Sequence, residues 1–224
     1  MPTIKKSTLS FLRKLQKNNH KDWMHANKPI YQAARANLKE FMVALETRMN
    51  EVDVIERHSL SRINRDIRFS KDKTPYKDYF WGNLTRFGHN RRGGYGFSIE
   101  ASLPHQVGGG FWGPNKEDLY RIRQEIATDS SRIRAILDEP KFKATFGSLQ
   151  GDAVKTAPRG FDKNHAAIDL IRFKQFYALK TFSDEEILQA DFIDKVVDCF
   201  ETLRPFFDYM TEVLTTDANG ESIL

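Results

Sequence analysis

Apolar side chains recur at helical spacing through the first fifty residues. Leu9, Leu12 and Leu15 predict a short first helix, because residues three and four apart share one helix face. Residues 22–26 begin a second helix, and Pro29 suits the first turn of a longer third one, where no backbone N–H is needed. The buried stripe of this third helix is expected to comprise Ala34, Leu38, Phe41, Met42, Leu45 and Met49.

The period of the pattern changes to two in the middle of the chain. Residues 95–103 alternate apolar side chains with small or polar ones, which predicts a strand with one buried and one solvent-exposed face. Ile63, Ile67 and Phe69 form the apolar side of a second alternating run, although Arg65 interrupts it. Less regular strand patterns occupy residues 83–87, 107–112 and 175–182.

Helical spacing returns in the second half of the chain, at residues 116–127, 131–137 and 192–214. Pro205 is expected to interrupt or kink the last of these helices, since proline lacks the N–H that the helix needs. Helices at both ends of the chain around consecutive strands indicate a single α+β domain, with a largely antiparallel sheet flanked by N-terminal and C-terminal helices. This domain is predicted to cover residues 7–214, with flexible ends at residues 1–6 and 215–224.

Composition agrees with one hydrophobic core. The 224 residues are 40% hydrophobic and 12% aromatic, which supplies ample buried material and excludes a disordered chain. The single cysteine, Cys199, lies in an apolar stretch and is predicted to be a small buried hydrophobe. The N-terminus has no apolar signal-peptide core, and the chain has no run of about 18 uncharged apolar residues. A cytoplasmic protein that does not enter a membrane is therefore expected.

Charge is distributed unevenly along the chain, although the net charge is only +5. Residues 1–100 hold 20 Lys and Arg against 10 Asp and Glu, whereas residues 101–224 hold 15 against 20. The basic excess is strongest in residues 62–92, and the acidic excess in residues 183–221. This split favours a positive surface for an acidic ligand and an acidic flank that would repel a long polyanion. Two ordinary solvated faces are an equal alternative.

The segment RDIRFSKDKTPYK, residues 65–77, concentrates the basic charge. Guanidinium groups match phosphate or carboxylate oxygens bidentately, and lysines add point charges, so this segment is predicted to bind such an anion. The residues expected to hold the anion are Arg65, Arg68, Lys71, Lys73 and Lys77. Asp66 and Tyr76 are candidates for proton transfer. The alternative is a structural network of Asp–Arg ion pairs that fixes a loop.

A second basic segment, PRGFDKNH at residues 158–165, surrounds a predicted turn. Arg159 and Lys163 are expected to add to the anion site, and Gly160 would let the backbone approach the ligand. His165 is a third candidate for proton transfer, and it is equally suited to cap the following helix. We expect the two basic segments to line one concave site.

Several familiar motifs are excluded. Gly108, Gly110 and Gly113 satisfy a G-x-G-x-x-G spacing, but bulky residues fill the gap and no βαβ unit surrounds them, which favours a glycine-rich hairpin. The chain has no phosphate-binding P-loop, no nucleophile elbow and no cysteine pair for zinc. Its histidines are scattered. Neither a cofactor nor a metal is therefore expected.

Four sequence blocks carry a family resemblance. They are NNHKDWMHANKPIY at residues 18–31, RDIRFSKDKTPYK at 65–77, GGGFWGP at 108–114 and PRGFDKNHAAIDLIRFKQF at 158–176. In this order they resemble the signature blocks of the bacterial and fungal family catalogued as domain of unknown function 2461. The candidate residues of both basic segments match that family's blocks position by position, and Ala166, where proline is common, is the mildest departure. The resemblance implies a one-domain cytoplasmic protein and assigns no activity.

Three functions remain open, together with the oligomeric state. The first is a binder of, or an enzyme acting on, a phosphorylated or carboxylated small molecule in a basic cleft. The second is a weak nucleic-acid-binding accessory protein that uses residues 62–92 as its phosphate track. The third is a non-catalytic interaction domain, in which the charged stretches serve as ion-pair staples.

Overall fold

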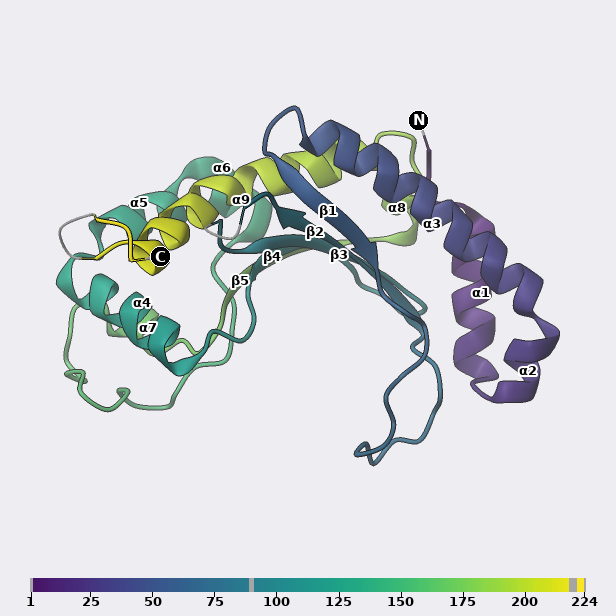
Figure 1. Cartoon of the computed structure of the whole chain (residues 1–224), viewed down its shortest axis with the longest axis horizontal. Helices are drawn as coiled ribbons and strands as arrows, with labels where there is room; N and C mark the ends of the chain where they lie inside the picture. The colour runs from purple at the N-terminus through teal and green to yellow at the C-terminus, as the bar shows by residue number, and fades with distance from the viewer. Residues whose placement is uncertain (1, 89–90, 218–220, 224) are drawn as a thin grey trace. The chain divides into compact units, whose positions relative to one another are not determined.

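A five-stranded antiparallel sheet forms the centre of the fold (Figure 1). The computed structural model describes residues 2–88, 91–217 and 221–223. The strands are β1 (Ile55–Leu60), β2 (Tyr79–Arg86), β3 (Gly94–Glu100), β4 (His105–Phe111) and β5 (Phe176–Phe182), hydrogen-bonded in the order β1-β2-β3-β4-β5. Each strand therefore pairs with its neighbour in sequence, and the predicted α+β class with a largely antiparallel sheet is confirmed.

Helices precede the sheet, interrupt it between β4 and β5, and end the chain. Within the described residues they are α1 (Lys6–Lys17), α2 (Lys21–Ala26), α3 (Lys28–Met49), α4 (Lys116–Thr128), α5 (Ser131–Asp138), α6 (Pro140–Phe146), α7 (Ile168–Ile171), α8 (Asp184–Ile187) and α9 (Phe192–Thr215). The six helices predicted from apolar spacing are confirmed. The helices α6, α7 and α8 were not predicted: α7 and α8 have four residues each and α6 has seven, and one or two turns show little periodicity.

The chain divides into two compact units, and each is described by itself. Unit 1 comprises Met1–Thr85, Gly96–Val107 and Thr181–Asp198; unit 2 comprises Arg86–Tyr95, Gly108–Lys180 and Cys199–Leu224. The boundaries fall inside β2 to β5 and inside α9, not in linkers. This placement agrees with the single-domain class.

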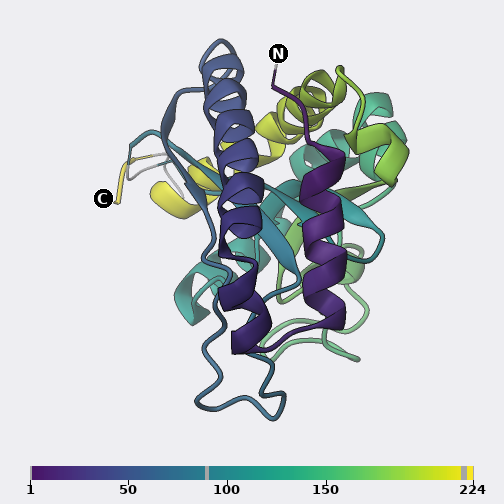
Figure 2. The same cartoon turned by 90° about the vertical axis from the view of Figure 1, so that its right-hand side faces the viewer.

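The core of unit 1 is built on α3. All six apolar residues predicted for its stripe are buried, and Phe41 packs edge-on against Phe97 of β3 at a ring separation of 5.5 Å. Helix α1 lies beside α3, and α2 joins the two at one end (Figure 2). Leu9, Leu12 and Leu15 of α1 are also buried, so the amphipathic pattern of the sequence correctly identifies both inward faces.

Two strand predictions are corrected by the structure. Strand β3 has no solvent-exposed face, because Ser98 is buried and the ring of Trp81 covers Gly96. Residues 63–69 do not form a strand but part of a long loop, and Phe69 is 96% exposed instead of buried. Within this loop the Asp66 carboxylate accepts from the backbone N–H of Arg68, so a side chain takes the place of a ladder partner for this group.

The buried histidine of unit 1 connects β4 to α8. The backbone N–H of Glu100 donates to Nδ1 of His105 over 3.0 Å, so the ring proton resides on Nε2, which donates to Oδ1 of Asp184 over 3.0 Å. Burial lowers the pKa of His105 below its ordinary value, although the Asp184 carboxylate opposes this effect. The folded protein therefore holds this imidazole neutral.

We expect the stability of unit 1 to decrease on acidification through His105. A depressed histidine pKa contributes stability that is complete above about pH 6.5 and is lost as the pH falls towards the folded-state pKa. The melting temperature of His105→Gln should therefore depend less on pH than that of the wild type between about pH 7 and about pH 5. His25→Gln, at an exposed position of α2, is the control and should keep the wild-type slope. Equal slopes for all three proteins would contradict the assignment.

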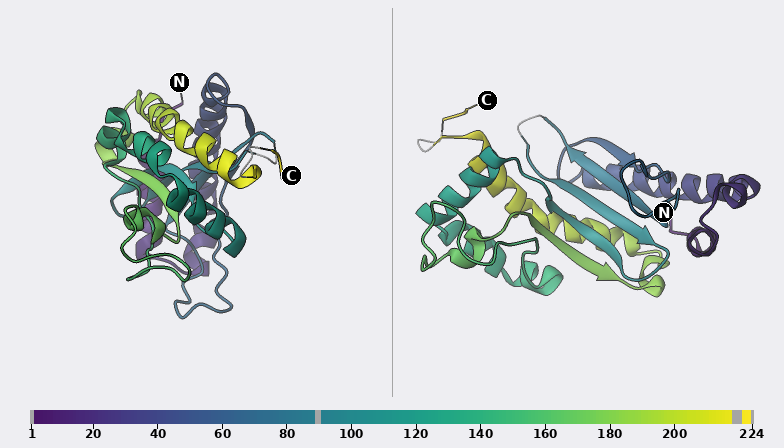
Figure 3. Two further views of the ribbon diagram at one scale, coloured as in Figure 1. Left: turned by 90° about the vertical axis from the view of Figure 1, so that its left-hand side faces the viewer. Right: turned by 90° about the horizontal axis from the view of Figure 1, so that it is seen from below.

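Aromatic packing forms the core of unit 2. Tyr95 lies 4.9 Å from the ring of Phe200 and 5.0 Å from that of Phe207, both on α9. Helix α9 continues through Pro205, so the predicted interruption does not occur. The buried aromatic residues that follow Pro205 outweigh the lost hydrogen bond. The C-terminal half of α9 lies beside α5 (Figure 3), and Arg132 pairs there with Glu212 over 2.7 Å.

The glycines of β4 permit close approach of backbone in unit 2. A Cβ atom on Gly108 would lie 2.0 Å from the carbonyl oxygen of Ala178 in β5. This contact explains the glycine-rich sequence as a strand feature, in agreement with the predicted hairpin and not with a dinucleotide-binding loop. Cys199 is buried in this unit, as predicted.

We expect Gly108→Ala to destabilise the protein by about 3 kcal/mol or more, because the added methyl group meets backbone that cannot move without breaking the β4–β5 pairing. Chemical denaturation measures this difference. Gly113→Ala is the matched control, since no heavy atom lies within 4 Å of its added Cβ. Its free energy of unfolding should stay within about 0.5 kcal/mol of the wild-type value. A comparable loss in both variants would refute the steric explanation.

Candidate functional site

The first basic segment lies in the loop of residues 61–78, which joins β1 to β2 in unit 1 and extends beyond the strands (Figure 1). The base of the loop is held by two backbone hydrogen bonds. The N–H of Arg65 donates to the carbonyl of Pro75 over 2.9 Å, and the N–H of Lys77 donates to that of Ile63 over 2.7 Å. Ile63 itself is buried, so it anchors the base in the core.

Asn19, between α1 and α2, fixes the returning arm of the loop. Its Nδ2 donates to the carbonyl of Tyr76 over 2.9 Å, and its Oδ1 accepts from the N–H of Tyr76 over 3.1 Å. One side chain thus satisfies both polar backbone groups of one residue, as a neighbouring strand would. The partner of this asparagine lies 57 positions away, so the sequence gave no local signal of the pairing.

The arm between Arg65 and Thr74 is held by Asp72. The Asp72 carboxylate accepts from the Thr74 N–H over 2.9 Å, from the Thr74 hydroxyl over 2.9 Å and from Nη1 of Arg65. These contacts, the Thr74 N–H first and then Arg65, lower the pKa of Asp72 to about 2. Asp72 is therefore ionised at neutral pH and serves as a fixed acceptor within the loop.

A second ion pair lies nearer the tip of the loop. Arg68 binds Asp66 bidentately, with Nε to Oδ1 at 2.9 Å and Nη2 to Oδ2 at 2.6 Å. The pair lowers the pKa of Asp66, although 77% of the Arg68 side chain and 61% of the Asp66 side chain are exposed. Both arginines of this segment thus have aspartate partners, as the structural alternative predicted.

The three lysines of the segment differ in their surroundings. Nζ of Lys73 donates to the carbonyl of Ile67 over 3.0 Å, whereas the ammonium of Lys77 lies 5.7 Å from the centre of the Tyr79 ring. Lys71 is exposed and has no ion-pair partner among the described residues. The excess positive charge expected from the sequence therefore resides in lysines, not in arginines.

A cleft of about 560 Å³ opens beside the loop in unit 1, and we call it the loop cleft. It is lined by Gln16, Asn19, Arg65, Asp66, Asp72, Thr74, Tyr76, Lys77, Asp78 and Tyr79. Of the predicted site residues, four therefore lie together: Arg65, Asp66, Tyr76 and Lys77. The lining combines two cations with three carboxylates, so it is mixed in charge, not uniformly basic. Gln16, Asp78 and Tyr79 were not predicted: folding brings Gln16 in from α1, whereas Asp78 and Tyr79 follow the predicted segment directly in the chain.

The second basic segment, residues 158–165, lies in unit 2. Its turn closes with a hydrogen bond from the Phe161 N–H to the Pro158 carbonyl over 3.2 Å, and Gly160 adopts a positive φ of 89°. Arg159 and Lys163 are exposed, and neither has an ion-pair partner in the part of the chain that the structure describes. Both remain candidates for holding an anion.

His165 uses both ring nitrogens in backbone hydrogen bonds. Nδ1 accepts from the N–H of Ala167 over 3.0 Å, so Nε2 carries the proton and donates to the carbonyl of Ala127 over 3.1 Å. The ring thereby ties the chain before α7 to the end of α4. This arrangement corresponds to the structural alternative for His165, since proton transfer would first require breaking one of these bonds.

The two basic segments belong to different compact units. That they line one site, and that Arg159, Lys163 and His165 act together with the loop, stays a prediction. Across residues 2–88, 91–217 and 221–223, no group of three or more His, Cys, Asp or Glu is placed to hold a metal ion. None of the helices in these ranges is long and apolar enough to cross a membrane.

We expect Asn19→Ala to loosen the returning arm of the loop. Loss of both hydrogen bonds to Tyr76 should lower the free energy of opening the loop by about 1–2 kcal/mol and raise tryptic cleavage after Lys71 or Lys73 roughly tenfold. Limited proteolysis with mass spectrometry measures this rate. Asn164→Ala, at an exposed asparagine of the second segment, should leave it unchanged. An unaltered rate in Asn19→Ala would show that the loop is held by other contacts.

A family model described as conserved hypothetical protein DUF2461 matches residues 7–209 of the chain. The match covers both basic segments and all residues that line the loop cleft. No curated protein and no solved structure matches the chain.

Proposed function

The chain belongs to the DUF2461 family of conserved hypothetical proteins, and we propose that its loop cleft binds a phosphorylated or carboxylated small molecule that also carries hydroxyl or amino groups. The observation that carries this proposal is the lining itself. Cations, carboxylates and two tyrosines converge on one cleft whose loop is fixed by its own hydrogen bonds. A few convergent polar groups in a preformed concave site are typical of small-molecule recognition.

Arg65 and Lys77 are suited to the anionic group. The bonds from Arg65 to Asp72 and Thr74 both use Nη1, which leaves the N–H groups on Nε and Nη2 for a ligand. These two nitrogens form the fork that binds a carboxylate or phosphate bidentately. The Lys77 ammonium supplies a second, mobile positive charge from the same side of the loop base.

The carboxylates are suited to the remainder of the ligand. Asp78 accepts from Nε2 of Gln16 over 2.8 Å through Oδ2, and Oδ1 is left to accept from a ligand hydroxyl or ammonium group. Asp66 and Asp72 are held ionised by their arginine and threonine partners, so they too act only as acceptors. A simple inorganic anion would be repelled by three carboxylates and would bind less well than a ligand that brings donors.

The lowered pKa values of Asp66 and Asp72 favour ligand binding over acid–base catalysis at this cleft. A general base works best when its pKa lies near the ambient pH, and the contacts of Asp66 and Asp72 lower theirs away from it. Asp66 and Tyr76 as proton-transfer residues are accordingly a secondary hypothesis within this proposal. The runner-up, a phosphate track for nucleic acid, is less well supported because both arginines of the loop already have aspartate partners.

The proposal is tested with ligands that differ only in the groups named above. Glucose 6-phosphate and phosphoserine should each raise the melting temperature in a concentration-dependent manner, whereas glucose and inorganic phosphate should have weaker effects. Lys77→Gln should weaken binding of the active ligand roughly tenfold, because it removes one of two charges that contact the anion. Calorimetry on the same proteins measures the affinity.

Lys39→Gln, on the exposed face of α3 and outside the cleft lining, is the matched control and should bind as the wild type does. A shift that survives in Lys77→Gln, or one produced equally by inorganic phosphate, would place binding elsewhere. Binding of a single-stranded oligonucleotide at physiological salt, stronger than that of either small molecule, would favour the nucleic-acid function instead.

A further inference from the structure

Helix α1 carries a basic face opposite its buried apolar stripe. Its apolar residues are buried against unit 1, and the opposite side carries Lys6, Arg13, Lys14 and Lys17. At 3.6 residues per turn, these four positions occupy roughly a 100° sector of the helix. The sector is therefore a continuous basic face about three turns long, not a scatter of surface lysines.

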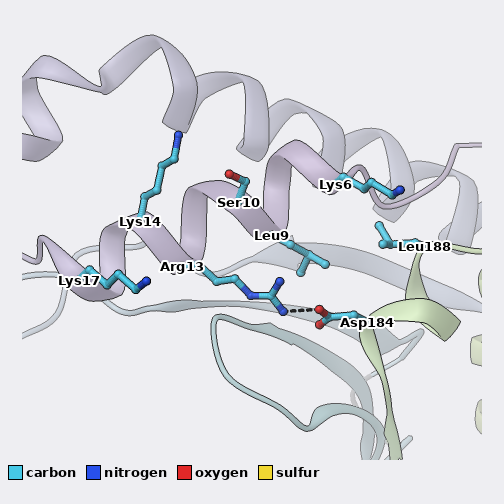
Figure 4. A pocket seen from close by; sticks show the side chains of 8 residues that line it. All are labelled: Lys6, Leu9, Ser10, Arg13, Lys14, Lys17, Asp184 and Leu188. Carbon is cyan, nitrogen blue, oxygen red and sulfur yellow. Dashed lines mark hydrogen bonds and ion pairs between the residues drawn. The ribbon is translucent and has the colours of Figure 1, made fainter.

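This face borders a cleft of about 410 Å³, which we call the α1 groove (Figure 4). Its far side is made by Asp184 of α8 and by Leu188, both in unit 1. Leu9 lies between the basic residues and contributes an apolar floor. The volume is in the range of small-molecule sites.

The single carboxylate of the groove is already occupied. Oδ2 of Asp184 pairs with Nη2 of Arg13, and Oδ1 accepts from Nε2 of His105 over 3.0 Å. Arg13 and then His105 lower the pKa of Asp184, and the same contacts leave neither of its oxygens for another cation. Across the residues that the structure describes, no carboxylate pairs with Lys6, Lys14 or Lys17. Three positive charges therefore face the groove without compensation.

From this arrangement we propose that the α1 groove binds a compact ligand that carries two or more phosphate groups. Lysine ammonium groups are strongly hydrated point charges, which match the high charge of phosphate better than the single charge of carboxylate. The α-carbon of Lys6 lies about 10 Å along the helix from that of Arg13, and Lys17 about 6 Å further. One phosphate cannot span these distances, but two or three linked phosphates can contact several of the flexible lysines at once.

A compact ligand fits this groove better than a long nucleic-acid backbone. Helix α8 begins with three consecutive acidic residues, Asp184, Glu185 and Glu186, of which Asp184 borders the groove. A chain of phosphates that crossed the groove would meet this acidic border, whereas a short polyphosphate can stay on the α1 side. This site is separate from the loop cleft, and no residue lines both.

Calorimetric titration with inorganic pyrophosphate at about 0.15 M salt tests the proposal. Pyrophosphate should bind the wild type one to one, at least about tenfold more tightly than inorganic phosphate or citrate. The double variant Lys14→Gln, Lys17→Gln should weaken it by a further factor of about ten while keeping the melting temperature, because both side chains are exposed. Lys39→Gln and Lys77→Gln should bind pyrophosphate as the wild type does.

Three results would overturn the proposal. If pyrophosphate binds no more tightly than inorganic phosphate, the groove is not specific for linked phosphates. If the double variant binds pyrophosphate as tightly as the wild type, the site does not lie on α1. Tighter binding of a single-stranded oligonucleotide that depends on the same two lysines would identify the groove as a nucleic-acid surface. Lys77→Gln alters only the loop cleft. The same experiment therefore distinguishes failure of the α1-groove proposal from failure of the proposed function of the loop cleft.

Discussion

The attachment of α1 to α3 is the interaction on which both candidate sites depend. Asn37, buried on α3, accepts from the backbone N–H of Lys5 over 3.0 Å and from the Thr8 hydroxyl over 2.9 Å, and it donates to the Thr3 carbonyl over 2.8 Å. No side chain of the local sequence caps α1, so this long-range contact is what attaches its N-terminal end to α3. It orients α1 with its apolar stripe inward, its basic face towards α8 and Gln16 towards the loop cleft.

Side-chain-to-backbone hydrogen bonds help to fix the chain in both basic segments. Asn19 accepts from the backbone N–H of Tyr76, as a neighbouring strand would. Asp72 accepts from the N–H of Thr74, and Asp162 accepts from the N–H of Asn164 in the other basic segment. Such local bonds hold a loop in one conformation without requiring a hydrophobic face. The nearly complete exposure of Phe69 follows from this construction, because the loop is held from its base and sides and needs no burial at its tip.

The ion pairs that basic side chains make, and not the number of basic residues, decide where positive charge is available to a ligand. The sequence places its basic excess in residues 62–92, yet four of its arginines pair with carboxylates: Arg65 with Asp72, Arg68 with Asp66, Arg86 with Asp208 and Arg92 with Asp118. Helix α1 has fewer basic residues, but the carboxylate that lines the α1 groove, Asp184, is bonded to Arg13 and His105. An exposed ion pair contributes little stability, but it reduces the charge that an anion meets, so Arg65 offers a ligand only the N–H groups that Asp72 and Thr74 leave unused.

The sequence by itself determined the α+β class, six of the helices, the buried stripe of α3 and the family, because helical periodicity and extended motifs are properties of contiguous residues. It also identified four residues of the loop cleft, since these lie within one segment. Only the tertiary structure decided that residues 63–69 are not a strand, that both faces of β3 are covered and that His165 is bonded to backbone on both sides. These features and both clefts depend on residues that are far apart in the sequence. Arg13 and Asp184, for example, are 171 positions apart, so no local sequence pattern indicates their contact.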